Sequence, residues 1–239
     1  MSFEEIATDC WVVGEDVVAL LCDMNGDRIF DPFWDPAQTL HVEPAYRNNI
    51  REGQDAYALD SWIGRVPDPS WGIWLQGPYS GANPRRTAAL ARDLVSKGYR
   101  EVFNLTPAAI GSNYWALDVW PHATAIVCMG RYAFHAGRTL TASTPKGGTV
   151  VHERGQRVYG NRHEIALVYY GERAEELCES VHKHLPLSKQ AKGAKRPIFR
   201  NVTIEKSITL ESVGSGPEPA PAKVTDLSGT EGAPAKRTG

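Results

Sequence analysis

The residues Gln76-Gly77-Pro78-Tyr79 offer an amide, a rigid turn and an aromatic ring within four positions. They follow Ile73, Trp74 and Leu75, which are typical of the end of a buried strand, and the Gly-Pro pair stops that strand. In an open α/β sheet, ligands bind beyond the carboxyl ends of the strands. An amide that forms hydrogen bonds beside a ring that stacks is suited to a planar heterocycle. We therefore expect a ligand site at residues 76–79, with an ordinary turn as the alternative.

Strand patterns and helix patterns alternate along most of the chain. Strands are expected at residues 28–30, 73–75, 101–105, 124–129 and 164–170. Helices are expected at residues 12–23, from Asn83-Pro84 to a cap at Gly98, at 114–119 and at 174–184. This alternation favours crossover connections, and so an α/β fold with a mostly parallel sheet flanked by helices.

Three segments lack this regular pattern. Residues 37–70 are rich in turn signals and are expected to be irregular, and residues 135–162 are expected to form a long loop excursion from the sheet. Residues 202–210 alternate apolar and polar positions, which indicates a possible late strand. We expect one domain over 1–185, a basic segment with the possible late strand over 186–214, and a disordered tail over 215–239.

Composition restricts the class of protein. The chain has 239 residues, 42% of them hydrophobic, and a net charge of -2, which allows one sizeable core. Its four cysteines and the histidines His122, His135, His152 and His163 show no metal-ligand spacing, so we expect no metal and no disulfide framework. Acidic residues break up the first ten positions and no apolar run reaches the roughly 20 residues of a membrane span. We expect a soluble, cytoplasmic protein.

Charge is unevenly distributed, because residues 183–206 carry seven basic side chains against one acid, Glu205. This block is either a solvated surface or a strip that binds phosphate. Further basic residues, including Arg138, Arg154 and Arg157, lie in the 135–162 excursion.

Six short motifs occur in an order that resembles a known family. They are Asp9-Cys10-Trp11, Phe30-Asp31-Pro32, Gln76-Gly77-Pro78-Tyr79-Ser80, Leu105-Thr106-Pro107-Ala108, Tyr114-Trp115 and Gly130-Arg131-Tyr132-Ala133-Phe134. Over roughly residues 8–171, the chain resembles the phage and prophage type of DNA N-6-adenine methyltransferase, the Dam family. The resemblance implies a Rossmann-like methyltransferase fold and S-adenosylmethionine as the methyl donor.

The resemblance also implies roles for individual residues. The cofactor would be held by Asp31, Pro32 and Phe33 at the first strand end, with Asp55 or Asp60 near the adenosine part and Trp11 nearby. An adenine flipped out of double-stranded DNA would donate its amine hydrogens to the Gln76 side chain and the Gly77 carbonyl and stack on Tyr79, with Pro78 completing the catalytic motif. DNA phosphates would be contacted by Arg131, Arg138, Arg154 and Arg157. Phe134 and Trp115 are expected in the core.

The resemblance leaves three functions open. The first is N6-adenine methylation of DNA by a phage or prophage enzyme, which protects the DNA from restriction in the host cytoplasm. The family has Asn-Pro where this chain has Gln76-Gly77, so the second is a relative that binds DNA or the cofactor without transferring a methyl group. The third is an interaction protein in which the turn only joins a strand to a helix. The oligomeric state stays open.

Overall fold

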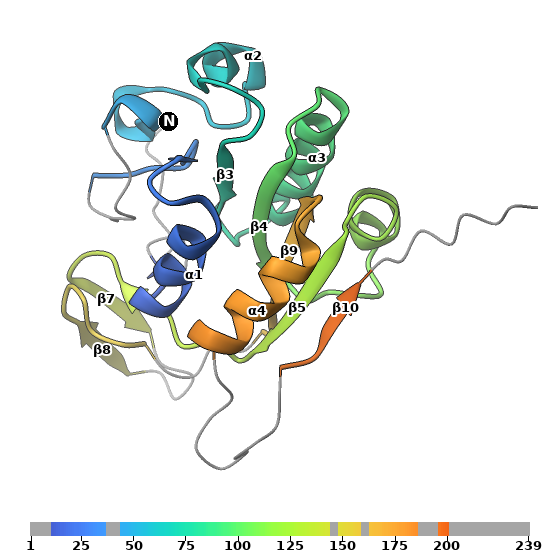
Figure 1. Ribbon diagram of the computed structural model, residues 1–239. Coiled ribbons are helices and arrows are strands. Elements are labelled where there is room, and N and C mark those ends of the chain that lie inside the picture. Colours follow the sequence, from blue (N-terminus) through green and yellow to red (C-terminus); the bar gives the residue numbers. More distant parts are fainter. Residues whose placement is uncertain (1–10, 37–43, 144–147, 159–162, 186–195, 201–239) are drawn as a thin grey trace, which may run out of the picture. The chain divides into compact units, whose positions relative to one another are not determined.

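A six-stranded mixed sheet lies at the centre of the fold (Figure 1). The computed structural model describes residues 11–36, 44–143, 148–158, 163–185 and 196–200, which belong to one compact unit, Met1–Val202. In spatial order the strands are β10 (Ile198–Arg200), β5 (Ala125–Gly130), β9 (Ile165–Gly171), β4 (Glu101–Pro107), β3 (Gly72–Leu75) and β2 (Ile29–Phe30).

The expected α/β fold with helices against a sheet is confirmed, but the sheet is mixed and only partly parallel, not mostly parallel. The pairs β2–β3 and β3–β4 are parallel, whereas β9 runs antiparallel to both β4 and β5, and β10 runs antiparallel to β5. The reason is the connection from β5 to β9. It leaves β5 at Gly130 and enters β9 at Ile165, and these two residues are paired, so the chain returns at the same edge and must run back. The carboxyl ends of β2, β3 and β4 still share one edge of the sheet.

Helices cover both faces of the sheet. Helices α1 (Glu15–Asn25) and α4 (Ala174–His184) pack on one face, and α3 (Asn83–Ser96) with the π-helical turn η5 (Trp115–Val119) packs on the other. Successive β4 residues alternate between the two cores, since Phe103 packs with α1 and α4 and Val102 packs with α3. The predicted helices are present, although the first begins at Glu15 and not at residue 12, because Val12 is part of a short strand. Gly26 (φ 63°) ends α1 and Gly98 (φ 90°) follows α3.

The segment between β2 and β3 is irregular, as expected from its turn signals. Its described part holds one helical turn, α2 (Leu59–Trp62), and the 3₁₀ turns η2 (Pro44–Tyr46), η3 (Ile50–Glu52) and η4 (Ile63–Arg65). Trp62 is fully buried and stacks on Phe30 with ring centroids 5.2 Å apart. This stacking attaches the irregular segment to the sheet.

The predicted loop between β5 and β9 contains strands, so that expectation is also wrong. Its strands are β6 (His135–Ala136), β7 (Leu140–Ser143) and β8 (Thr149–His152), of which β7 and β8 form an antiparallel hairpin. The short strand β1 (Trp11–Val12) pairs with β6. These strands are two to four residues long and mostly half-buried or exposed, so they carry too few buried apolar positions to give a strand pattern.

The possible late strand at 202–210 and the tail at 215–239 lie outside the described residues, as do 186–195. The described part of the basic segment forms the unexpected edge strand β10.

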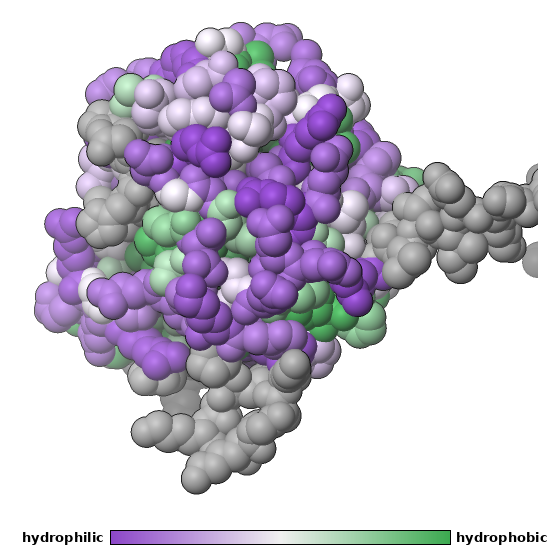
Figure 2. Space-filling model, viewed as in Figure 1, coloured by the Kyte–Doolittle hydropathy of each residue, from purple (hydrophilic) through white to green (hydrophobic). Residues whose placement is uncertain are grey.

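The face covered by α1 and α4 is mainly hydrophilic (Figure 2). This agrees with the amphipathic pattern of both helices, which bury Leu20, Leu21, Leu177 and Val181 against the sheet. Within the described ranges, none of the helices has the length and apolar character needed to cross a membrane.

Candidate functional site

The turn after β3 orients the Gln76 amide. Strand β3 is wholly buried, and Gln76 is the first residue after it that is only half-buried. The Gln76 Nε2 donates a hydrogen bond of 2.6 Å to the backbone carbonyl of Trp11. Because a carbonyl only accepts hydrogen bonds, the amide NH₂ must face Trp11, and the Gln76 Oε1 is left as the acceptor of this side chain.

A pocket of about 340 Å³ lies beside this turn. Its walls are mainly apolar and include three aromatic side chains, those of Trp11, Tyr79 and Tyr114. Pro107, the last residue of β4, and Ile165, the first of β9, also line it. The pocket therefore lies at the edge of the sheet where β3 and β4 end, which is where open α/β sheets bind ligands.

Phe134 supports the aromatic wall of the pocket from the core. It is fully buried, and its ring centroid lies 5.7 Å from that of Tyr79, 5.9 Å from that of Trp11 and 5.2 Å from that of Tyr132. Tyr79 itself is half-buried, and burial raises the pKa of its phenol, so the hydroxyl stays protonated. The expected core positions of Phe134 and Trp115 are confirmed.

Gly77 is enclosed by side chains from two other segments. A Cβ at this position would overlap the Thr87 Oγ1 of α3, and it would lie 3.1 Å from the Tyr57 hydroxyl and 3.2 Å from the Phe33 ring. The Thr87 hydroxyl donates to the Asn83 carbonyl and lies 3.2 Å from the Tyr57 hydroxyl. A residue with a side chain therefore does not fit here without movement of Thr87.

The turn after β2 supplies Phe33, one of the side chains that enclose Gly77. Asp31, Pro32 and Phe33 are all buried, and the Phe33 ring packs edge-on against Tyr57 at 5.1 Å. The Asp31 Oδ1 accepts a hydrogen bond of 2.9 Å from the Phe33 backbone N–H. Burial raises the pKa of Asp31 from 3.8 to about 7, an effect that the Phe33 hydrogen bond only partly opposes.

The two remaining acids of the expected cofactor set lie on the surface. Asp55 is exposed, and its side chain accepts a hydrogen bond from the Tyr57 backbone N–H. Asp60 is also exposed and lies 3.5 Å from Lys97. Asp55 thus positions Tyr57, which in turn packs on Phe33.

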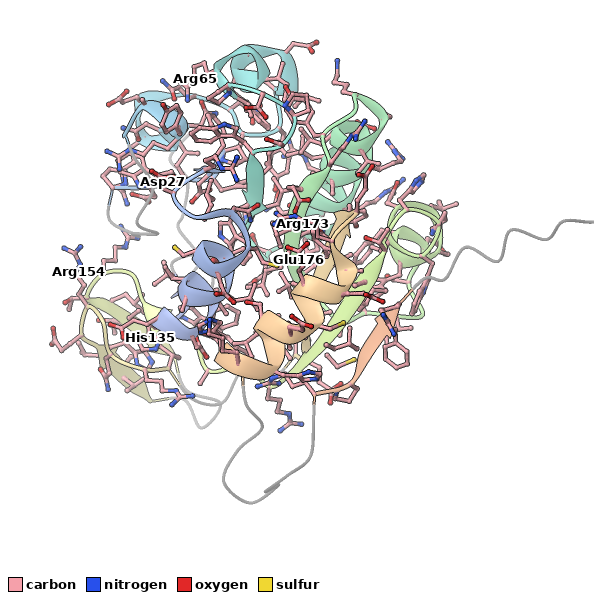
Figure 3. The ribbon with its side chains drawn as sticks, in the orientation of Figure 1. Asp27, Arg65, His135, Arg154, Arg173 and Glu176 are labelled. Atoms are coloured by element: carbon pink, nitrogen blue, oxygen red, sulfur yellow. The ribbon has the colours of Figure 1, made fainter. Side chains whose placement is uncertain are left out.

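The expected DNA-contacting arginines all lie on the connection from β5 to β9. Arg131, Arg154 and Arg157 are exposed, and Arg138 is half-buried. Arg154 lies on the outer side of the β7–β8 hairpin, and His135 lies at its base (Figure 3). Arg157 also lines a second hollow, of about 650 Å³, beside the first turn of α1.

The structure brings some of the expected site residues together and separates others. Trp11 and Tyr79 line one pocket, beside which Gln76 lies, whereas Asp31, Pro32 and Phe33 form a buried turn behind Gly77. The sequence interpretation gave no site role to Arg85, Tyr114 or His163, all of which line the pocket. Tyr114 follows the end of β4, and Arg85 follows the helix start at Asn83-Pro84. These positions in the sequence were the signals that could have identified both as site residues.

Among the described residues, no group of histidine, cysteine, aspartate and glutamate side chains has the arrangement needed to hold a metal ion. The chain matches no protein-family model, no curated protein and no solved structure.

Proposed function

We propose that this protein transfers a methyl group from S-adenosylmethionine to the N6 amine of adenine in DNA, on a Rossmann-like methyltransferase fold. The observation that carries the proposal is the Gln76 amide, held by Trp11 so that its oxygen is the acceptor, beside an aromatic-walled pocket lined by Tyr79. The pocket lies at the carboxyl ends of β3 and β4, and its volume of about 340 Å³ suits one base-sized ligand.

The chemistry explains why an amide and a ring are needed. The exocyclic amine of adenine is a poor nucleophile, because its lone pair is delocalised into the ring. The Gln76 Oε1 and the Gly77 carbonyl would each accept one N–H and so favour a pyramidal nitrogen. Tyr79 would stack on the base, which must leave the duplex to reach the pocket. Stacking of this kind contributes about 1–3 kcal/mol per base.

The environment of Asp31 fits a cationic cofactor. S-adenosylmethionine, when bound, supplies the methyl group, and it carries a positive sulfonium. Within the described ranges, the buried carboxyl of Asp31 has a backbone hydrogen bond and a raised pKa, and no cationic side chain is paired with it. A cation at this strand end would favour the ionised carboxylate. Asp31 would hold the cofactor, and Pro32 and Phe33 would support the turn after β2 from below. Asp55 and Trp11 would lie at the borders of the cofactor site.

DNA is the proposed macromolecular partner. Arg131, Arg138, Arg154 and Arg157 all lie on the connection from β5 to β9, which contacts the pocket wall through the packing of Phe134 on Tyr79. These arginines would contact DNA phosphates farther from the extruded base than the phosphates that flank it. The biological setting proposed is a phage or prophage protecting DNA from restriction in the host cytoplasm.

The test is methyl transfer itself. The purified chain is incubated with labelled S-adenosylmethionine and duplex DNA, and N6-methyladenine is measured after digestion. We expect transfer by the wild type and by Tyr79→Phe, which keeps the ring, and loss of transfer by Tyr79→Ala. Both variants are checked by thermal unfolding. An absence of transfer to any DNA would contradict the proposal, and equal transfer by Tyr79→Ala would show that the site is wrong.

A second candidate function is favoured by the enclosure of Gly77. Thr87, Tyr57 and Phe33 fill the space that the proline ring of the family motif needs, so this chain is adapted to Gln76-Gly77. A relative that binds DNA without methylating it would show salt-sensitive binding and no transfer. Changing Gln76-Gly77 to Asn-Pro tests whether the family motif restores methyl transfer. Because Thr87 occupies the space that a proline at position 77 needs, this change must be combined with Thr87→Ala.

A further inference from the structure

Arg85 lies on the rim of the aromatic pocket and is not used by the proposed chemistry. It is the third residue of α3, directly after Pro84, and both residues line the pocket. Its side chain is exposed, and no carboxylate of the described residues pairs with it. By contrast, the neighbouring Arg86 guanidinium stacks on the Tyr57 ring at 3.8 Å, away from the pocket.

The position of Arg85 is electrostatically unfavourable for the helix alone. The amino end of a helix carries a partial positive charge, and acidic residues are favoured there. The first turn of α3 has no acidic residue, and the preceding residue Ala82 provides no side-chain cap. The Asn83 N–H donates to the Ser80 carbonyl and Pro84 has no N–H, so the Arg85 backbone N–H is the donor that this first turn leaves over. The Arg85 guanidinium and its own N–H thus present positive charge and hydrogen-bond donors at one place. This combination is suited to an anion.

The pocket supplies the second half of the site. Three aromatic side chains and Pro107 form its walls, and His163 joins Arg85 among its polar lining residues. Such walls are suited to a planar base. The phosphate joined to the sugar of that base would lie outside the pocket, at the rim, where the cation is. A free nucleoside would fill the space between these walls, but it has no anionic group to pair with the Arg85 guanidinium at the rim.

We propose that Arg85 binds the phosphate next to the base held in the pocket, so that the site takes a nucleotide within a strand in preference to a free nucleoside. The inference rests on the proposed function, because it identifies the pocket as the place of the extruded base. It adds a specificity residue that acts on binding.

The experiment uses two single-stranded oligodeoxynucleotides with one adenine each. They differ only in the phosphates on either side of that adenine, which are charged in one and replaced by neutral methylphosphonates in the other. Affinity is measured by fluorescence anisotropy for the full chain, for Arg85→Gln and for Arg100→Gln. Arg100 is the control for position, because it is an exposed arginine just before β4, at the opposite end of that strand from Pro107, where it lies 3.5 Å from Glu172.

We expect neutralisation to weaken wild-type binding about tenfold, as expected for the loss of a charge-assisted hydrogen bond. Arg85→Gln should bind the charged strand about tenfold more weakly and should be insensitive to neutralisation. Arg100→Gln should behave as the wild type. If Arg85→Gln keeps wild-type affinity, or loses as much as the wild type on neutralisation, the inference is wrong. Methyl transfer to duplex DNA by the wild type is measured separately, so failure of the proposed function is distinguished from failure of this inference.

Discussion

At the scale of single residues, Gly77 and Thr87 are matched to each other. The space above the Gly77 Cα is occupied by the Thr87 hydroxyl, which is itself fixed by its hydrogen bond to the Asn83 carbonyl. Because protein interiors are close-packed, one additional methyl group in such a place forces a neighbour to move. The turn that carries Gln76 and Tyr79 thus depends on a side chain of α3.

This matching predicts a coupling between the two positions. Gly77→Ala should destabilise the protein by about 1–3 kcal/mol, because the new methyl group overlaps Thr87. In a Thr87→Ala background the same change should cost at least about 1 kcal/mol less, since the overlapping oxygen is gone. Urea unfolding of the four proteins of the cycle measures this coupling. Equal costs of Gly77→Ala in both backgrounds would show that Thr87 does not enclose Gly77.

At the scale of elements, the β7–β8 hairpin has little support from the core. Neighbouring side chains of a strand point to opposite faces, and both Val150 and Val151 are exposed, so neither face of the hairpin is covered at this point. A two-stranded ribbon of this kind has the dimensions to enter the major groove of DNA. Arg154 lies on its outer side (Figure 3).

The arrangement predicts a defined salt dependence. If Arg154 and Arg157 each contact a phosphate, changing either to Gln should reduce the slope of log affinity against log salt concentration by roughly 0.9. The slope is measured by titrating duplex DNA at several KCl concentrations. Arg100→Gln, on the opposite edge of the sheet, serves as the control and should leave the slope unchanged. If neither Arg154→Gln nor Arg157→Gln changes the slope of log affinity against log salt concentration, these two arginines do not contact DNA phosphates.

The elements also show which structural features the sequence could predict. Helix α3 was predictable, because Pro84 and Gly98 are local signals for its ends and its apolar residues repeat at helical spacing. The direction of β9 was not, since a fully buried run such as Ile165–Tyr170 has the same pattern in a parallel or an antiparallel strand. The Gln76–Tyr79 turn was visible as a motif. The pocket was not, because its lining comes from residues as far apart as Trp11 and Ile165.

At the scale of the whole molecule, two buried carboxyl groups at opposite ends of the sheet, those of Glu101 and Asp31, differ in their partners. At the amino edge, Arg173 lies at the start of α4 (Figure 3). It donates two hydrogen bonds of 2.9–3.0 Å to the buried Glu101, and it also donates to the Met24 carbonyl and to the Asn25 side chain at the end of α1. This network satisfies the carboxylate and joins α1, β4 and the start of α4. At the carboxyl edge, Asp31 is buried with a backbone hydrogen bond and, among the described residues, no paired cation.

The unpaired carboxyl of Asp31 gives the molecule a predictable pH dependence. Because its pKa is about 7 in the folded state and near 3.8 when unfolded, the folded state holds the proton more tightly between these values. The contribution of this group to stability is therefore full below about pH 4 and declines as the pH rises towards 7. The pKa difference corresponds to roughly 4 kcal/mol, which is an upper limit for the effect.

Asp31→Asn keeps an oxygen for the Phe33 N–H and removes the charge, so it should unfold at a higher temperature than the wild type at pH 8. A gain of about 1–2 kcal/mol corresponds to roughly 2–8 °C in a chain of this size. The gap should close by pH 4–5, where the wild-type carboxyl is protonated. The same variant should lose affinity for S-adenosylmethionine at pH 8, because the proposed cofactor is a cation. Equal melting temperatures at both pH values would show that the Asp31 charge is already compensated, and a stabilised variant with unchanged cofactor affinity would remove Asp31 from the site.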